Sequence, residues 1–146
     1  MAGSTTYNSK YTVVEGSAAA ASSNLTGDEV DTAGFDGIKF YAIVTPASSA
    51  STCSLKAQSA ASTTCTFYDI AGSTAEYAAG PVARTNLLIS HVHKPIDRWV
   101  RPFLTLDVSN HAVGGIFAEL YGPKTAPVTS TSSDTYYAFT CSASTS

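Results

Sequence analysis

Apolar and polar side chains alternate with a period of two along several short stretches of this chain, which is the pattern of a β-strand with one buried face. The clearest stretch is GIKFYAIVT at residues 37–45, in which every even-numbered residue from Ile38 to Val44 is apolar and after which Pro46 follows. Proline lacks the backbone N–H that a sheet needs, so it ends the pattern. We therefore predict a strand over residues 37–45 with its even-numbered side chains in the core.

Seven stretches with strand patterns, separated by turn residues, predict a protein made of β-strands. They are residues 11–14, 37–45, 53–58, 64–69, 86–92, 99–108 and 116–121. No segment shows a convincing amphipathic helix period. The predicted fold class is all-β, an antiparallel, jelly-roll-like β-sandwich with extended N- and C-terminal arms. Five residues on the apolar phase of their strands are predicted to be buried together between two sheets: Phe40, Val44, Leu104, Leu106 and Ile116.

Residues 53–58 and 64–69 flank a connection rich in Ser and Ala, so we predict that they form a hairpin. A hairpin centred near Ser59 would put Cys53 opposite Cys65. The chain has three cysteines, an odd number, and no CxxC pair. Free thiols are therefore favoured, and a bridge between the two opposed cysteines is the alternative.

A corner of the sandwich is predicted between residues 86–92 and 99–108, where Lys94 and Pro95 interrupt the strand pattern. The only dense group of charged residues in the sequence lies there: Lys94, Asp97, Arg98 and Arg101. These side chains can pair locally at the corner or form an ion-pairing face for another subunit, and the sequence favours neither.

Two further predictions concern the strands beside this corner. In the strand before it, we expect Leu88 and either Leu87 or Ile89 to point inward. In the strand after it, Pro102 has no N–H to donate, which predicts a sheet edge or a bulge at that position.

The two ends of the chain differ in composition from its middle. Residues 10–123 form one predicted sandwich domain, residues 1–9 a small polar arm with Tyr7, and residues 124–146 a Ser/Thr-rich linker with an aromatic segment. The aromatic side chains of that segment are Tyr136, Tyr137 and Phe139. Since they are costly to expose, we expect residues 136–141 to pack as an added strand on a sandwich edge or across an interface.

The small number of charged residues excludes some classes of binding partner. Only 13% of the 146 residues are charged, and eight basic against eleven acidic residues give a net charge of −3. A nucleic-acid-binding surface needs clustered, excess Lys and Arg, so we expect no nucleic-acid partner. No apolar stretch approaches the roughly 20 residues that cross a bilayer, and no secretion signal is recognisable, so we expect no membrane partner and synthesis in a host cytoplasm.

Histidine spacing gives the strongest hint of a chemical site. His91 and His93 lie two residues apart, so in a strand both rings point to one side, as metal ligands would. With Asp97 they form an H-x-H-x3-acid pattern that is similar to the first metal-binding motif of cupins, and His111 is a separate candidate for a third ligand. Thr85 stands where that motif has glycine, and the Pro-x-Gly of the second motif is absent. We therefore favour solvated or hydrogen-bonded histidines and expect no metal and no cofactor.

The remaining chemical motifs are weak. No G-x-S-x-G turn is present to hold a nucleophilic serine. Asp28, Glu29 and Asp31 match no calcium loop and are interpreted as a solvated turn. We therefore expect no enzymatic activity.

Six segments, in their order and spacing, resemble the bacteriophage capsid decoration (cement) proteins. They are TVVEG at 12–16, DTAGFDG at 31–37, LKAQ at 55–58, YDIAG at 68–72, KPIDRWVR at 94–101 and the final strand into Gly122 and Pro123. The resemblance implies a non-enzymatic, jelly-roll-like virion protein that binds the outer surface of the assembled capsid and stabilises it. The long C-terminal extension departs from the family pattern.

On this resemblance, the partner is the major capsid protein of a tailed phage, and the chain is a homo-oligomer, a dimer or trimer, on the outer surface of the virion. The expected capsid or subunit contacts are Tyr7, Lys94, Arg98, Trp99, Arg101, Tyr136, Tyr137 and Phe139. One alternative is a carbohydrate-binding or adhesive head-fibre module whose exposed Tyr and Trp rings stack on sugars. A more remote one is a cupin-like metal-binding protein.

Overall fold

All regular structure in the described part of the chain is β-strand. The computed structural model describes residues 9–16, 18–21, 24–46, 48, 51–77, 84–107 and 111–124. The strands are β1 (Ser9–Glu15), β2 (Ala18–Ala21), β3 (Leu25–Thr26), β4 (Val30–Asp31), β5 (Gly37–Thr45), β6 (Cys53–Ala60), β7 (Tyr68–Asp69), β8 (Ala75–Tyr77), β9 (Asn86–His93), β10 (Trp99–Leu106) and β11 (His111–Tyr121). Among these residues there is no helix that could cross a membrane.

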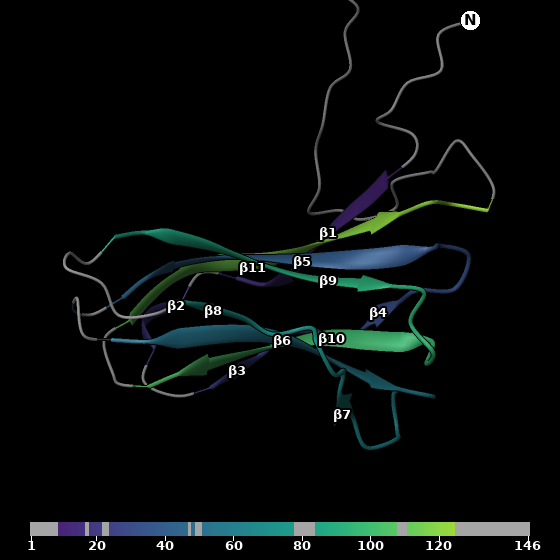
Figure 1. The fold of residues 1–146 in the computed structure, drawn as a ribbon, viewed down its shortest axis with the longest axis horizontal. Coiled ribbons are helices and arrows are strands. Elements are labelled where there is room, and N and C mark those ends of the chain that lie inside the picture. The colour runs from purple at the N-terminus through teal and green to yellow at the C-terminus, as the bar shows by residue number, and fades with distance from the viewer. Residues whose placement is uncertain are drawn as a thin grey trace, which may run out of the picture.

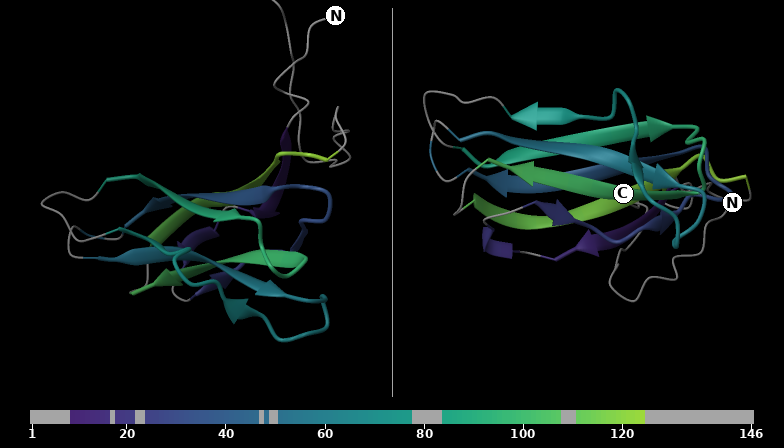
Figure 2. Two further views of the ribbon diagram at one scale, coloured as in Figure 1. Left: turned by 45° about the vertical axis from the view of Figure 1, so that its right-hand side comes forward. Right: turned by 90° about the horizontal axis from the view of Figure 1, so that it is seen from below.

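The strands form two antiparallel sheets that lie face to face (Figure 1). Sheet A has the order β1-β11-β5-β9, and β2 also pairs with β11. Sheet B has the order β3-β10-β6-β7, with β4 also on β10 and β8 also on β6. The view from below in Figure 2 shows the strands of the two layers running broadly along the same axis, as in an aligned sandwich.

The order of pairing identifies the sandwich as a jelly roll. Strands pair from the outside of the sequence inward: β1 with β11, β3 and β4 with β10, β5 with β9, and β6 with β7 and β8. Sheet A takes the first and third of these pairs, and sheet B takes the second and fourth. This is one long hairpin wrapped across two sheets, the jelly-roll arrangement. The predicted fold class, an all-β antiparallel sandwich, is confirmed.

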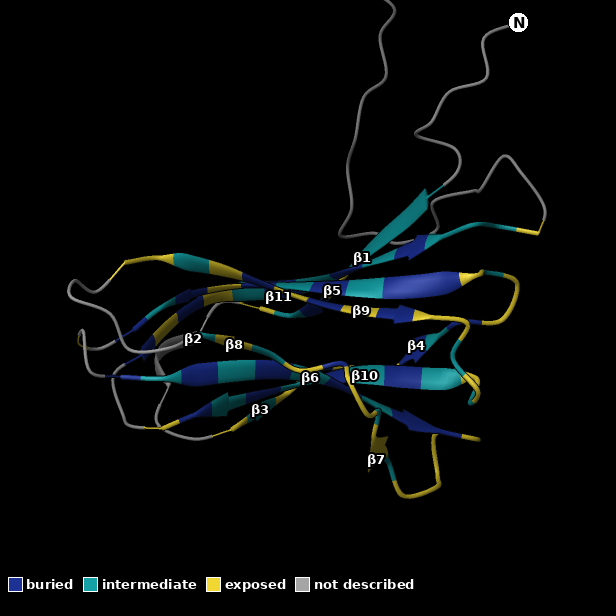
Figure 3. Cartoon of the chain, viewed as in Figure 1, coloured by how far each residue is buried: buried dark blue, intermediate teal, exposed yellow. Residues whose placement is uncertain are grey.

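The core lies between the two sheets, where alternate residues of the long strands are buried (Figure 3). The five residues predicted to form it, Phe40, Val44, Leu104, Leu106 and Ile116, are all buried. The strand predicted over 37–45 has those bounds and buries its even-numbered side chains, as expected from the sequence.

In β9, the structure corrects one prediction. Leu88 and Val92 point inward, but Leu87 and Ile89 are both exposed, so the expectation that one of them is inward is wrong. The third inward residue is Ser90, whose hydroxyl donates to the carbonyl of Ser73 across the sandwich at 2.6 Å. A buried polar group is tolerated because this hydrogen bond satisfies it.

The predicted hairpin exists in a shorter form and with another register, because only Tyr68–Asp69 (β7) of the predicted strand at residues 64–69 is strand. β6 pairs with β7 through Gln58 and Asp69, so the turn lies later in the chain than Ser59. Cys53 is opposite Leu106 and Tyr77 instead of Cys65, which is exposed in the turn. Both thiols are free, and burial, with the Asp107 carboxylate, raises the pKa of Cys53 to about 11. The opposition of the two cysteines is therefore wrong, because β6 continues to Ala60 before it turns.

Pro102 and the Gly114-Gly115 pair also differ from expectation. β10 lies inside sheet B, so Pro102 does not mark an outer edge of the sheet. Pro102 falls between the part of β10 that pairs with β3 and the part that pairs with β4. Its carbonyl accepts a hydrogen bond from Gly27 N–H at 3.0 Å. The missing N–H therefore costs no ladder bond. Gly115, at φ +126°, lies inside β11 as a register irregularity; β11 begins at His111, earlier than predicted.

Candidate functional site

The outer face of sheet A carries a continuous group of apolar side chains. One cross-strand row runs from Val13 through Phe117 and Tyr41 to Ile89, and a neighbouring row joins Ile43 to Leu87. Val13, Ile43, Leu87 and Ile89 are between 41% and 56% exposed. We call this set the sheet A apolar face: Val13, Tyr41, Ile43, Leu87, Ile89 and Phe117. Contiguous exposed apolar side chains of this kind mark interaction surfaces on soluble proteins.

This face carries a stacked pair of aromatic rings and is slightly hollowed. The rings of Tyr41 and Phe117 stack at 4.8 Å with an interplanar angle of 12°. Beside them, Gly114 and Gly115 present no side chains and leave a hollow of about 270 Å³ bordered by Val13 and Ile43. A preformed hollow between ordered apolar walls can accept a protruding side chain from a partner with little loss of conformational entropy.

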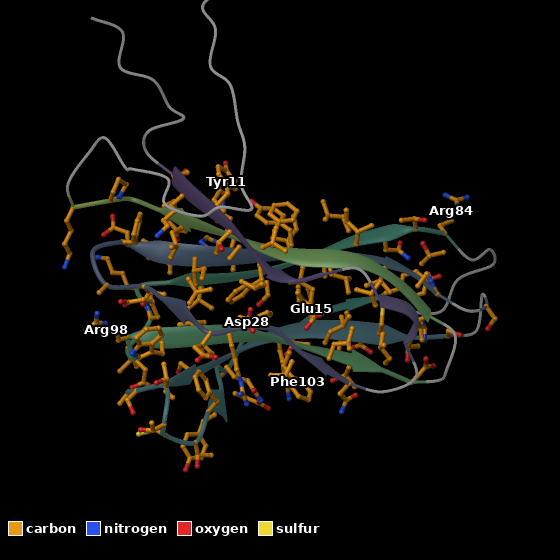
Figure 4. All side chains as sticks on the ribbon, turned by 180° about the vertical axis from the view of Figure 1, so that it is seen from behind. Tyr11, Glu15, Asp28, Arg84, Arg98 and Phe103 are labelled. Carbon is orange, nitrogen blue, oxygen red and sulfur yellow. The ribbon has the colours of Figure 1, made fainter. Side chains whose placement is uncertain are left out.

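A carboxylate with two tyrosine donors borders the apolar face. Glu119 accepts hydrogen bonds from the Tyr11 hydroxyl at 2.9 Å and from the Tyr41 hydroxyl at 2.7 Å. Burial opposes ionisation of Glu119, but these hydrogen bonds and the Lys39 ammonium outweigh it and lower its pKa. Burial and the Glu119 carboxylate raise the pKa of both tyrosines. In Figure 4, Tyr11 lies on the outer side of sheet A, and Phe103 lies on the outer side of sheet B.

At the end of the same face, two histidines meet one tyrosine. The Tyr121 hydroxyl lies 2.5 Å from His91 Nε2 and 2.9 Å from His93 Nδ1. The two histidines therefore point to one side of β9, as the sequence spacing predicts. The Lys39 ammonium lies 5.4 Å from the centroid of the Tyr121 ring, and burial together with this charge lowers the pKa of His91.

The corner residues expected to contact a partner are mostly bound within the chain. Arg98 makes two hydrogen bonds of 2.7 Å to the Asp31 carboxylate and lies over the Trp99 ring. Arg101 donates to Gln58 and lies 4.2 Å from the centroid of the Phe67 ring. Lys94 is exposed, with a left-handed φ of 52°. Local ion pairing therefore describes Arg98, whereas Arg101 is held by an uncharged amide and an aromatic ring.

Four other expected contact residues lie outside the described part of the chain: Tyr7, Tyr136, Tyr137 and Phe139. The described part of the chain begins at Ser9 and stops at Lys124. Ser9 pairs with Tyr121, and Lys124 N–H donates to the Gly34 carbonyl at 2.8 Å. These two residues therefore lie at the same end of sheet A, next to the corner.

The residues considered as a cupin-like metal set do not meet. His111 is buried at the opposite end of β11 from Tyr121, where its Nε2 lies 2.8 Å from Asp107, and Asp97 accepts from Ser59. Across the described residues, no group of three His, Cys, Asp or Glu side chains is arranged to hold a metal ion. In the acidic turn, Asp31 is the partner of Arg98, while Asp28 and Glu29 are exposed.

Sequence reasoning missed the sheet A apolar face. The signal was present, because Ile43 and Ile89 stand on the strand phase opposite to the core residues. Apolar side chains on both phases of a strand indicate that its outward face is also partly apolar. Recognising the face as one surface also required knowing that β1, β11, β5 and β9 are neighbours.

No protein-family model and no curated protein matches the chain. Matches among solved structures include the CBM22-1 and GH10 modules of Clostridium thermocellum endo-1,4-β-D-xylanase 10B in complex with xylohexaose, at 12% identity and a TM-score of 0.41. That match covers 80% of this chain but 30% of the xylanase chain. The Eiger TNF from S. frugiperda matches at 8% identity and a TM-score of 0.37, covering 86% of this chain and 99% of that one. At these identities the similarity concerns the fold alone.

Proposed function

We propose that this chain is a non-enzymatic structural protein of a bacteriophage virion that binds the outer surface of the assembled capsid and stabilises it. The observation that carries the proposal is the sheet A apolar face, on which Leu87 is 56% exposed and Ile89 is 44% exposed. The resemblance of six sequence segments to capsid decoration proteins supplies the class of partner, the major capsid protein.

The face has the composition of an interface core with a polar border. The next cross-strand row beside the apolar row from Val13 to Ile89 is polar, and it joins Glu119 and Lys39 to His91, whose side chains can hydrogen-bond at the margin of a contact. An apolar centre with a polar rim is the common anatomy of protein interfaces. A protein that binds the assembled lattice in preference to free subunits stabilises that lattice by mass action.

Capsid binding by face variants tests the proposal. Purified protein is mixed with capsids that lack it, and occupancy is measured by electron microscopy. Leu87→Asp combined with Ile89→Asp should abolish occupancy, since two carboxylates would be buried without partners. The matched control is Tyr68→Asp, a 70% exposed tyrosine on sheet B outside both this face and the corner, which should bind like the wild type. Wild-type occupancy by the double variant would exclude this face, and absence of wild-type binding to every capsid tried would contradict the function.

A carbohydrate-binding or adhesive module is the second candidate, and one observation favours it. Tyr68 is 70% exposed beside a hollow of about 430 Å³ that is also lined by Asp69 and Asp97. An exposed aromatic ring can stack on a sugar, and the neighbouring carboxylates can accept hydrogen bonds from its hydroxyl groups. Binding of the purified protein to a glycan array, lost in Tyr68→Ala, would support this candidate over the capsid role.

A further inference from the structure

Three side chains that can coordinate a metal converge at the end of sheet A: His91, His93 and Tyr121. Both imidazole nitrogens, Nε2 of His91 and Nδ1 of His93, are within hydrogen-bond distance of the same Tyr121 oxygen, at 2.5 and 2.9 Å. This is a different set from the one considered on sequence spacing, since a tyrosine on β11 takes the place of the aspartate and the third histidine.

These three groups can meet because the strand between them, β5, has a glycine at the position that separates them. Gly37 of β5 pairs with His93 on one side and with Tyr121 on the other. A Cβ at Gly37 would overlap the end of the Tyr121 ring. Because glycine has no side chain, the ring can lie across β5 and bring its hydroxyl to β9.

The two distances to the Tyr121 oxygen suit ligands of one ion. Metal–nitrogen and metal–oxygen bonds of about 2.0 Å place neighbouring ligand atoms roughly 2.8 to 3.3 Å apart. The 2.9 Å from His93 lies within this range, and the 2.5 Å from His91 needs to widen by a few tenths of an ångström. His91 and His93 are exposed, so an ion can enter from solvent and water can complete its coordination.

We infer that His91, His93 and Tyr121 form a surface site for a borderline divalent cation, with Cu²⁺ bound most tightly. Two imidazoles and one oxygen in an open, partly hydrated site match the tetragonal N,O geometry of Cu²⁺, which also stands highest in the divalent affinity order. On binding as a phenolate, Tyr121 releases its proton to solvent, so one proton leaves for each ion bound. The bound ion links β9 to β11 across β5.

One neighbouring charge opposes the site and so provides an independent readout. The Lys39 ammonium lies against the Tyr121 ring, 5.4 Å from its centroid, and repels a cation. The Glu119 carboxylate, next along the outer face of β11, partly offsets this repulsion. Lys39→Gln should therefore increase the affinity for Cu²⁺, an effect that no loss of structure would produce.

Calorimetric titration of the full-length chain with Cu²⁺ tests the inference. All proteins compared carry Cys65→Ser and Cys141→Ser as a common background, so that these two thiols do not react with copper. We expect one ion per chain. His91→Ala and His93→Ala should each weaken binding at least about tenfold, because even the loss of a group that only orients a metal ligand typically lowers metal affinity by that factor. Tyr121→Phe, which keeps the ring over Gly37, should weaken binding and remove the phenolate-to-copper absorption band. Every variant retains His111 and the N-terminal amine, so background binding is shared.

Metal-free circular dichroism and melting temperatures show whether each variant is folded. Equal Cu²⁺ affinity in the background protein and in the His91→Ala, His93→Ala double variant would overturn the inference. Unchanged affinity and an unchanged spectrum in Tyr121→Phe would overturn it as well. Neither result decides the capsid-binding proposal, because that proposal is tested through Leu87 and Ile89, which every copper-site variant retains.

Discussion

At the residue scale, Gly27 shows how one missing side chain fixes the packing of two strands. A Cβ there would lie 2.6 Å from Cγ of Pro102 and 3.1 Å from the Val14 carbonyl oxygen. Neither neighbour can turn away, because one is a proline ring in a buried strand and the other is backbone. Gly27→Ala should destabilise the fold by about 1 to 3 kcal/mol, as overpacking does. Urea denaturation measures this, with Gly16→Ala as control because a Cβ at Gly16 meets nothing within 4 Å. Equal losses in both variants would contradict this explanation.

Glu119 leads to a prediction about pH at the same scale. Its carboxylate accepts from Tyr11 and Tyr41, and its pKa is lowered in the folded state. A carboxyl with a lowered pKa adds stability that is complete above its unfolded pKa, about 4.3, and that is lost as the pH falls through the folded value. Glu119→Gln should therefore cost about 1 kcal/mol at pH 7, reduced from the usual range for charged hydrogen bonds by partial exposure.

The control for this prediction is Glu76→Gln, since Glu76 is exposed on β8. The free energy of unfolding of both variants and the wild type would be measured from pH 7 down to pH 3. The Glu119 variant should approach the wild type at the acid end. A difference that stays constant over the whole range would show that the charge of Glu119 is not the cause.

At the element scale, the face of the strand on which a leucine lies decides how much it contributes to the free energy of unfolding. Leu104 in β10 is fully buried, whereas Leu87 in β9 is 56% exposed. Leu104→Ala should lower the free energy of unfolding by about 2 to 5 kcal/mol, because it removes buried methyl groups and leaves a cavity. Leu87→Ala should change it by less than about 0.5 kcal/mol. Thermal melting of the two variants compares the same substitution on opposite faces, and similar melting temperatures would mean that the strand phase is wrong.

At the scale of the whole molecule, the jelly-roll pairing closes before the C-terminal arm begins. β11 is the last strand described, and it already pairs with β1, β2 and β5. Deletion of residues 126–146 should therefore leave a folded sandwich. We predict that this truncated chain forms smaller oligomers or binds capsids more weakly, because it lacks the aromatic segment. Size-exclusion chromatography and capsid occupancy measure the two effects, and full-length behaviour in both would show that the arm has no role in assembly.

The sequence determined the local features of this protein. Alternation of apolar residues is enough to locate the strand at residues 37–45, to choose its buried face, and to select Phe40, Val44, Leu104, Leu106 and Ile116 for the core. The spacing of His91 and His93 is enough to put both rings on one side of a strand. These predictions hold because the period of a strand depends only on backbone geometry.

Tertiary structure alone decided which strands became neighbours, and the surfaces of interest depend on that. Tyr121 meets His91 because β11 and β9 both flank β5 at Gly37, and the apolar rows join only across four strands of sheet A. Likewise, Cys53 faces Leu106 because β6 runs on before turning, and Arg98 finds Asp31 across the β10–β4 pairing. Such contacts join residues far apart in sequence, and a pattern of local periods contains no information on their register.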